Sequence, residues 1–288
     1  MTTNQHSARD GITLVTGGTG KIGRRVAARL DALDIPHRAV SRSSSPAFDW
    51  HEPDGWDDAL AGVSTAYIAF APDLAIPGTQ PIIRAFVERA VAAGVTHLVL
   101  LSGRGEEEAQ ACEEIVKASG VAWTIVRAAW FMQNFSEGEF ADMVRQGAIT
   151  LPARDIPEPF IDVNDIADVV VAAVSEDGHA GELYEVSGPR LLALSDVAAE
   201  ISAATGREIS FASVPRDAFA DAITAAGVPG EVAWLLNYLF DTVLDGRNAY
   251  VADGVERALG RKPADFRPFV QRIAARGNWH EAHEEAAA

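Results

Sequence analysis

The sequence predicts an α/β protein in which a doubly wound parallel sheet is followed by a smaller, mainly helical C-terminal lobe. Apolar runs without hydrophobic/polar alternation are separated by segments of helical periodicity, as in parallel sheets that are covered on both faces. A glycine-rich turn, TGGTGKIG over residues 16–23, connects the first strand to the first helix. Beyond residue 187 the chain changes character, and helices alone are predicted there.

The elements of the sheet domain follow one another in a regular order. Short apolar runs predict strands over residues 12–16, 36–42, 65–71, 96–102 and 122–130. Apolar residues at helical spacing predict helices over 21–33, through 82–91 with Gly94 as the stop, and over 106–118. A further helix begins near Asn164, and the strand-like run ELYEV follows it. This alternation indicates a parallel sheet with crossover helices.

Three helices are expected in the C-terminal lobe. They span residues 195–205, capped by Ser195, residues 215–226, opened by Pro215 and ended by Gly227, and residues 230–245, ended by Gly246. The chain is therefore expected to divide into a nucleotide-binding domain over 1–186, with 1–10 flexible, a substrate-binding lobe over 187–278 and a disordered tail over 279–288.

The composition is that of a globular protein, with no sign of a membrane or nucleic-acid partner. Hydrophobic residues make up 48% of the 288 residues, but no apolar run is long enough for a membrane span. A formal charge of −17 disfavours binding to nucleic-acid phosphates and anionic lipid. The polar N-terminus lacks the apolar centre of a secretory signal, and the single cysteine, Cys112, excludes an internal disulfide. We expect a cytoplasmic protein, either a monomer or a homodimer.

The glycine-rich turn has the spacing and the setting of a dinucleotide-binding loop. Gly17, Gly20 and Gly23 form a G-x-x-G-x-x-G pattern between a strand and a helix. Glycine allows a tight turn and lets peptide N–H groups approach a pyrophosphate, and the helix N-terminus adds its positive dipole. The pattern predicts a Rossmann-type nucleotide site. The residues predicted to line it are Gly17, Gly18, Thr19, Gly20, Lys21, Ile22 and Gly23.

Arg42 determines which nucleotide is expected. An acidic residue at the end of the second strand would hold the ribose 2′-hydroxyl of NAD, but this strand ends in VSRSSS. Because guanidinium and phosphate form charge-assisted hydrogen bonds, Arg42 favours NADP(H), with NAD(H) as the second option; a solvated surface arginine is the alternative. Asp49 is a candidate adenine contact or else a plain loop residue. Phe70, Ala71 and Ser102, near the ends of later strands, are further predicted nucleotide contacts.

Four segments carry a resemblance to a known family. They are TGGTGKIGRRVAARL, LSGRG, GVAWTIVRAAWFMQNF and PFIDVNDIADVVVAAV. In their order and spacing, from about residue 11 to 278, the chain resembles the NmrA-like branch of the atypical short-chain dehydrogenase/reductases. The resemblance implies a Rossmann domain, a smaller C-terminal lobe and a substrate cleft between them over the nicotinamide. It also implies an NAD(P)H-dependent reductase of quinones, alkaloids or other secondary metabolites, or a redox sensor that binds NADP without turnover.

Aromatic residues are the candidates for substrate binding. The predicted contacts are Trp130, Phe131, Asn134, Phe135, Trp234 and Tyr238. The first four follow the carboxyl end of a strand, where open α/β sheets bind ligands, and the resemblance places Trp130, Phe131 and Asn134 at the cleft. Trp234 and Tyr238 share a helix face, for which a core or dimer contact is the alternative. Such side chains suit a flat aromatic small molecule.

The proton donor is not evident from the sequence. The Tyr-x-x-x-Lys pair of most short-chain dehydrogenases is absent, because Glu113 stands four residues before Lys117. Ala109 occupies the position where the resemblance implies a histidine. Ser102 remains as a candidate catalytic hydroxyl, with a strand-end cap as its alternative, and Trp130 is the second residue assigned to the catalytic site. No metal is expected, because HEAH at residues 280–283 lacks the spacing of a zinc motif.

These observations predict an NAD(P)H-dependent oxidoreductase or tailoring enzyme that acts on a quinone-like or polycyclic aromatic molecule. The missing Tyr-Lys pair leaves a non-catalytic NADP-binding sensor as one alternative. An oxygenase- or isomerase-type tailoring enzyme on the same scaffold is the other.

Overall fold

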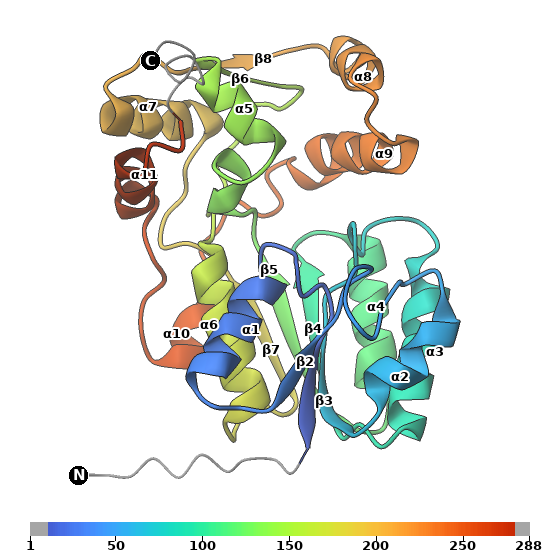
Figure 1. Cartoon of the computed structure of the whole chain (residues 1–288). Helices are drawn as coiled ribbons and strands as arrows, with labels where there is room; N and C mark the ends of the chain where they lie inside the picture. The colour runs from blue at the N-terminus through green and yellow to red at the C-terminus, as the bar shows by residue number, and fades with distance from the viewer. Residues whose placement is uncertain (1–10, 280–288) are drawn as a thin grey trace, which may run out of the picture. The chain divides into compact units, whose positions relative to one another are not determined.

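The computed structural model describes residues 11–279, and in it the chain forms two compact units (Figure 1). Within this range the first unit contains residues 11–128, 163–186 and 253–262, and the second contains residues 129–162, 187–252 and 263–279. The expected single boundary after residue 186 is therefore wrong, because each unit takes segments from both halves of the chain.

The structure describes only part of the two terminal segments for which the sequence predicts flexibility or disorder. The segments expected to be flexible, residues 1–10 and 280–288, lie outside the described residues. Trp279, which we expected in the disordered tail, is instead 1% exposed. Its indole Nε1 donates a 2.8 Å hydrogen bond to the carbonyl oxygen of Phe135. Burial of the indole thus extends the second unit to residue 279.

The first unit is built on a six-stranded sheet of order β2-β1-β3-β4-β5-β7, and each neighbouring pair of strands is parallel. The strands are β1 (Ile12–Val15), β2 (His37–Ala39), β3 (Val63–Ile68), β4 (His97–Gly103), β5 (Ala122–Ala128) and β7 (Glu182–Val186). Their shared direction brings the carboxyl ends of all six strands to one edge of the sheet. The doubly wound parallel sheet predicted from the sequence is confirmed.

Helices cover both faces of this sheet (Figure 1). One face carries α1 (Gly23–Ala32), α6 (Val163–Ser175) and α10 (Gly254–Leu259), and the other carries α3 (Thr79–Ala92) and α4 (Glu107–Lys117), with the short α2 (Trp56–Leu60) beside α3 after the turn η1 (Pro53–Gly55). Consecutive residues, whose side chains point to opposite faces of the sheet, are fully buried on the central strands: Leu14 and Val15, Leu98 and Val99, and Ile125 and Val126. This two-sided burial explains why the strands lack alternation in the sequence.

The second strand is shorter than predicted, because a serine-rich turn ends it. β2 stops at Ala39, whereas the sequence suggested a strand to residue 42. The peptide N–H of Ser41 donates to Ser44 Oγ at 2.8 Å, and Ser44 Oγ donates to the carbonyl oxygen of Ser41 at 2.8 Å. These bonds give the backbone an alternative to the strand ladder and place Arg42 in a turn.

The second unit combines helices with one pair of parallel strands. Its elements are η2 (Met132–Phe135), α5 (Glu139–Arg145), β6 (Ala148–Leu151), α7 (Leu194–Thr205), β8 (Ser210–Ser213), α8 (Arg216–Ala225), α9 (Gly230–Tyr238), the π-helical turn η3 (Leu239–Val243) and α11 (Phe266–Ala275). Strands β6 and β8 pair over four residues each. The unit has its own apolar core, in which Phe135, Phe266 and Phe269 are almost completely buried.

Helix α7 does not begin as the sequence suggested. Ser195 was the expected cap, but the helix starts at Leu194, and the Ser195 hydroxyl donates to a carboxylate oxygen of Asp155 at 2.5 Å. A carboxylate oxygen of Asp196 instead accepts the N–H of Ala193 at 3.0 Å. The carboxylate of Asp196, in the first turn of α7, therefore accepts the N–H of the residue that precedes the helix.

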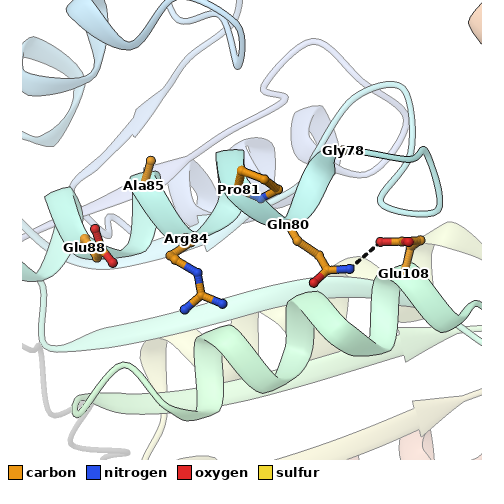
Figure 2. A pocket seen from close by; sticks show the side chains of 7 residues that line it. All are labelled: Gly78, Gln80, Pro81, Arg84, Ala85, Glu88 and Glu108. Carbon is orange, nitrogen blue, oxygen red and sulfur yellow. Dashed lines mark hydrogen bonds between the residues drawn. The ribbon is translucent and has the colours of Figure 1, made fainter.

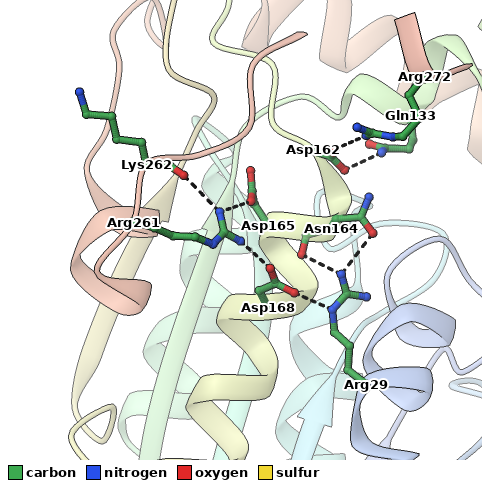
Figure 3. Close-up of polar contacts among 9 residues, drawn as sticks. All are labelled: Arg29, Gln133, Asp162, Asn164, Asp165, Asp168, Arg261, Lys262 and Arg272. Atoms are coloured by element: carbon green, nitrogen blue, oxygen red, sulfur yellow. Dashed lines mark hydrogen bonds and ion pairs between the residues drawn. The ribbon is translucent and has the colours of Figure 1, made fainter. Parts of the chain in front are cut away.

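Ion pairs and side-chain hydrogen bonds link separate segments inside each unit (Figure 3). In the first unit, Asp168 of α6 accepts from Arg29 of α1 at 2.6 Å and from Arg261, just after α10, at 2.5 Å. In the second unit, Asp162 accepts from Gln133 at 2.7 Å and from Arg272 at 3.1 Å. Across residues 11–279, no helix combines the length and the apolar character that a bilayer crossing requires.

Candidate functional site

The glycine turn lies where β1, β2 and β3 end. Gly17 has a φ of 63°, in the left-handed region that favours glycine. The peptide N–H of the next residue, Gly18, donates to the carbonyl oxygen of Val40 at 2.9 Å. Thr16 Oγ1 donates to the carbonyl oxygen of Tyr67 at 3.0 Å and accepts the N–H of Ala69 at 2.8 Å. The turn is thus anchored to both neighbouring strands.

Gly23 allows the helix to approach the turn. A Cβ at Gly23 would lie 2.2 Å from the carbonyl oxygen of Gly17, a distance that real Cβ contacts do not reach. A Cβ at Gly20 would lie 3.1 Å from its nearest atom, which is again the carbonyl oxygen of Gly17. The first i→i−4 hydrogen bond runs from Arg24 N to Gly20 O at 3.2 Å, so the helix ladder does not use the N–H groups of residues 22 and 23.

These features fit a pyrophosphate group. Thr19 and Gly20 are exposed, and Gly17 and Gly18 are half-buried, so the outer side of the turn is accessible. N–H groups at the start of a ten-residue helix, beside backbone without side chains, provide the donors and the positive dipole end that an anion requires. Lys21 is half-buried, and Ile22 is buried beneath the turn.

A pocket of about 480 Å³ brings together Arg42, predicted to select the nucleotide, and Asp49, predicted to contact the adenine. Arg42 and Asp49 both line it, and His51, Glu52 and Asp54 line it as well. Arg42 is exposed and lies beside three carboxylates in this pocket. The structure therefore assembles a charged site at the end of β2, with one guanidinium available to a phosphate.

Phe70 and Ala71 follow β3 at the same edge of the sheet. Phe70 is 9% exposed, and its ring lies 5.2 Å from the ring of Trp50, whereas Ala71 is exposed. Trp50 belongs to a cluster of aromatic rings with Phe48 and Trp56. Phe70 thus packs against the aromatic cluster whose member Phe48 lines the pocket, and Ala71 is accessible.

Ser102 is part of a buried ionic network. Its Oγ donates a 2.7 Å hydrogen bond to Oε1 of Glu113, a residue of α4 that is fully buried. The guanidinium of Arg127 on β5 donates to both oxygens of the same carboxylate, at 2.8 and 2.5 Å. The Ser102 proton therefore points at Glu113, and it could reach a substrate only if this bond were broken. The role of Ser102 as a proton donor remains a prediction.

A second pair extends this network along the carboxyl edge of the sheet. Arg104, directly after β4, is 3% exposed, and its Nε donates to Oε1 of Glu185 on β7 at 2.8 Å. Arg127 Nη1 lies 3.7 Å from the other oxygen of Glu185. The two arginines at the ends of β4 and β5 are thus paired with carboxylates from α4 and β7, which reduces the cost of burying their charges.

The predicted substrate residues all belong to the second unit. The Trp130 ring lies 5.3 Å from the ring of Phe240, in the turn that continues α9. On α9 itself, Trp234 is 41% exposed and is stacked on Tyr238, with ring centroids 5.3 Å apart and planes within 6°. Segments that are distant in the sequence therefore meet at the Trp130–Phe240 contact, and the Trp234–Tyr238 stack lies on the helix that leads into Phe240, with Trp234 open to solvent.

The other three predicted substrate residues differ in accessibility. Phe131 and Asn134 are half-buried. Phe135 is 1% exposed and packs 5.4 Å from the ring of Phe160 and 5.8 Å from that of Phe140. The expectation that Phe135 contacts substrate is therefore replaced by a packing role, since its ring is enclosed in the core of this unit.

Other features of the first unit serve packing and charge balance. A surface pocket of about 470 Å³ lies over α3 and α4, where Gln80 Nε2 donates to Glu108 at 2.6 Å (Figure 2). Cys112 is fully buried, and burial raises the pKa of its thiol to about 11, which is the behaviour of a structural thiol. No group of three or more potential metal ligands occurs between residues 11 and 279.

Sequence reasoning did not identify Arg127, Glu185, Asp73 and Glu106 as site residues. Arg127 and Glu185 stand in apolar strands where a charge is unusual, and a charged residue inside a buried strand could have served as a signal. Asp73 and Glu106 lie in loops and carry no such signal. Only the pairing of β3 with β4 brings these two loops to the same edge.

Comparison with known proteins gives a consistent picture. Residues 47–271 match the NmrA-like family. NAD(P)H azoreductase of Xenophilus azovorans is 30% identical, over 91% of this chain and 98% of that protein. Agroclavine dehydrogenase of Claviceps fusiformis is 31% identical, over 89% and 95%. The structure of Citrobacter triphenylmethane reductase with NADP(H) superposes with a TM-score of 0.77 at 20% identity, covering 91% of this chain and 99% of that chain, and shows a shared fold.

Proposed function

Because the chain belongs to the NmrA-like family, we propose that it is an NAD(P)H-dependent reductase that acts on a flat aromatic small molecule. The observation that carries the proposal is the glycine turn, which presents backbone N–H groups and a helix N-terminus at the carboxyl edge of a parallel sheet. Two relatives that are at least 30% identical, NAD(P)H azoreductase and agroclavine dehydrogenase, carry the names of oxidoreductases. They support redox chemistry over a purely structural role.

The residues of the first unit would hold the nucleotide. Residues 17–23 would bind the pyrophosphate through backbone donors, and Arg42 would bind a 2′-phosphate, which favours NADP(H) over NAD(H). When bound, the nucleotide supplies a hydride. The buried network of Ser102, Glu113 and Arg127 would keep the ends of β4 and β5 rigid beneath it.

The residues of the second unit would hold the acceptor. Trp234 and Tyr238 form a stacked pair whose accessible surface could take a further aromatic ring. Trp130 supports this region through Phe240. Binding by apolar contact and stacking needs few directional polar groups, so the acceptor class we propose is a planar quinone, azo compound or polycyclic cation.

The direct test is oxidation of NADPH, followed by its absorbance, against a panel of quinones, azo dyes, iminium compounds and aromatic ketones. We expect turnover with at least one planar aromatic acceptor and none without acceptor. A sensor would give no turnover with any acceptor, and NADPH would instead change its oligomeric state in light scattering. That second result would contradict the proposal.

The nucleotide preference can be tested at Arg42. Loss of one charge-assisted hydrogen bond costs about 1.5–3 kcal/mol, so Arg42→Ala should weaken NADPH binding by roughly ten- to a hundredfold in calorimetric titration. NADH affinity should hardly change, because NADH has no 2′-phosphate. Arg84→Ala is the matched control: Arg84 is exposed on α3 and lines a pocket that shares no residue with that of Arg42. Equal affinity of the wild type for both nucleotides would refute the preference.

The substrate role of α9 can be tested at Trp234. Because Trp234 is 41% exposed, Trp234→Ala should leave folding intact and lower kcat/KM for an aromatic acceptor by roughly tenfold, the equivalent of about 1.4 kcal/mol of stacking. The dissociation constant of NADPH should not change. Tyr250→Ala, which removes another exposed aromatic ring of the same unit, is the control. If both variants keep wild-type kcat/KM, the acceptor binds elsewhere.

A further inference from the structure

Two carboxyl groups, those of Glu106 and Asp73, meet at the carboxyl edge of the sheet in the first unit. Glu106 is the residue before α4, and Asp73 lies in the loop between β3 and α3. The two carboxyl groups lie within hydrogen-bonding reach of each other. Two carboxylates cannot form a hydrogen bond, because both would only accept, so one of the pair must carry a proton.

Glu106 is placed as a buried acid and does not act as a helix cap. It is 7% exposed and makes no capping hydrogen bond, although it stands at the start of α4. A Cβ built on Gly103 would lie 2.1–2.2 Å from the three atoms of its carboxyl group, so the carboxyl packs directly on the Cα at the end of β4. Among the described residues, Oε2 of Glu106 is buried and has no hydrogen-bond partner.

The charges around the pair favour the protonated form of Glu106. Burial, then the carboxylate of Asp73, then Glu113 raise the pKa of Glu106 well above its ordinary value. Burial also raises the pKa of Asp73, but the N–H of Ala75, which donates to its carboxylate at 2.8 Å, and the contact with Glu106 both favour its charged form. The two arginines that follow or end the neighbouring strands pair with other carboxylates: Arg127 binds Glu113, and Arg104 binds Glu185.

The pair lies at the same sheet edge as the glycine turn. Ala69, which follows β3, lies beside Gly17, and Asp73 follows four residues later in the chain. Glu106 follows the end of β4 by three residues, and β3 and β4 are neighbours in the sheet. This is the edge at which open parallel sheets bind their ligands.

We propose that Glu106 and Asp73 share one proton and that Glu106 delivers it to the reduced acceptor. The inference rests on the proposed reductase function. For an azo acceptor, the N=N π bond breaks as one nitrogen gains hydride, which carries the two electrons, and the other gains the proton. The O–H bond of Glu106 breaks and leaves a second carboxylate, which water then reprotonates. The pair thereby replaces the missing tyrosine as the acid.

The kinetic test compares an acceptor that needs a proton with one that does not. A triarylmethane dye cation becomes a neutral product on hydride addition alone, whereas an azo dye also requires a proton. Glu106→Gln should slow azo reduction by about a hundredfold and leave reduction of the cation unchanged. Glu107→Gln, an exposed neighbour on the same helix, should affect neither acceptor. Equal effects of Glu106→Gln on both acceptors, or no effect on the azo dye, would overturn the proposal.

The free protein provides a readout independent of turnover. At pH 7 the wild type should show the infrared C=O band of a protonated carboxylic acid, and Glu106→Gln should lack it. As the pH is raised, Asp73→Asn should lose this band at a lower pH than the wild type does, because the carboxylate that raises the pKa of Glu106 is gone. Absence of the band in the wild type refutes the shared proton.

The free energy of unfolding should depend on pH through the same proton. A carboxyl whose pKa rises on folding binds its proton more tightly in the folded state, so the free energy of unfolding falls as pH rises from 4.5 through the folded pKa. Glu106→Gln should remove this fall in urea denaturation. If the wild type reduces neither acceptor, both the proposed function and the delivery of the proton to an acceptor are contradicted. The infrared and stability results decide independently of turnover whether Glu106 and Asp73 share a proton.

Discussion

Gly23→Ala should abolish nucleotide binding. The new methyl group would lie 2.2 Å from the carbonyl oxygen and 2.7 Å from the carbonyl carbon of Gly17. Both are backbone atoms of the turn that Thr16 and Gly18 anchor to β2 and β3, so the clash cannot be relieved by rotating a side chain. Helix α1 must move away from the turn, and the donors that face the pyrophosphate then lose their common geometry.

We expect the dissociation constant of NADPH to rise by more than about a hundredfold, together with a loss of about 1–3 kcal/mol in the free energy of unfolding from overpacking. Calorimetric titration measures the first and urea denaturation the second. Gly230→Ala is the control, because a Cβ there meets nothing within 4 Å. A folded Gly23→Ala protein with normal NADPH affinity would show that the glycine turn is structural and that the nucleotide binds elsewhere.

Glu113→Ala should be among the most destabilising single changes in the first unit. The fully buried carboxylate accepts hydrogen bonds from Ser102 and, at two positions, from Arg127. Its removal leaves the guanidinium of Arg127, itself only 19% exposed, without this partner. Breaking one side of a buried ion pair costs about 3–5 kcal/mol, because the remaining charge keeps its desolvation penalty.

Urea denaturation measures this loss. Glu114→Ala on the same helix is the matched control: Glu114 is 71% exposed, pairs with Lys117, and should contribute no more than about 1 kcal/mol. The double change Glu113→Gln with Arg127→Met should recover stability relative to Glu113→Ala, since it removes the guanidinium that would otherwise lose its carboxylate partner. If Glu113→Ala and Glu114→Ala unfold at the same urea concentration, the buried network contributes nothing to stability.

The sequence by itself determined the sheet, its helices and the glycine turn. These features depend on local signals: apolar runs for strands buried on both faces, helical periodicity, and glycines at fixed spacing between a strand and a helix. The predicted helix 106–118 and strand 96–102 agree with α4 and β4 to within about one residue. The family resemblance, carried by short segments of fixed order, is likewise confirmed.

The division into units was decided only by tertiary packing. Residues 129–162 precede α6 in the chain but join the second unit, and α10 returns to the first. Linear patterns report the type of each element and do not report which core receives its apolar face. For the same reason Phe135, read as a ligand contact beside a strand end, is a core residue.

The chemistry of the site depends even more on tertiary structure. Glu106 begins a helix, where the sequence alone suggests a favourable interaction with the helix dipole. The fold instead turns its carboxyl onto Gly103 and sets it against Asp73, 33 residues away in the chain. Ser102 is likewise directed toward Glu113 by the packing of α4 on β4. Burial and partner geometry control whether such groups carry a proton, and these are properties of the folded chain, not of residue type or spacing.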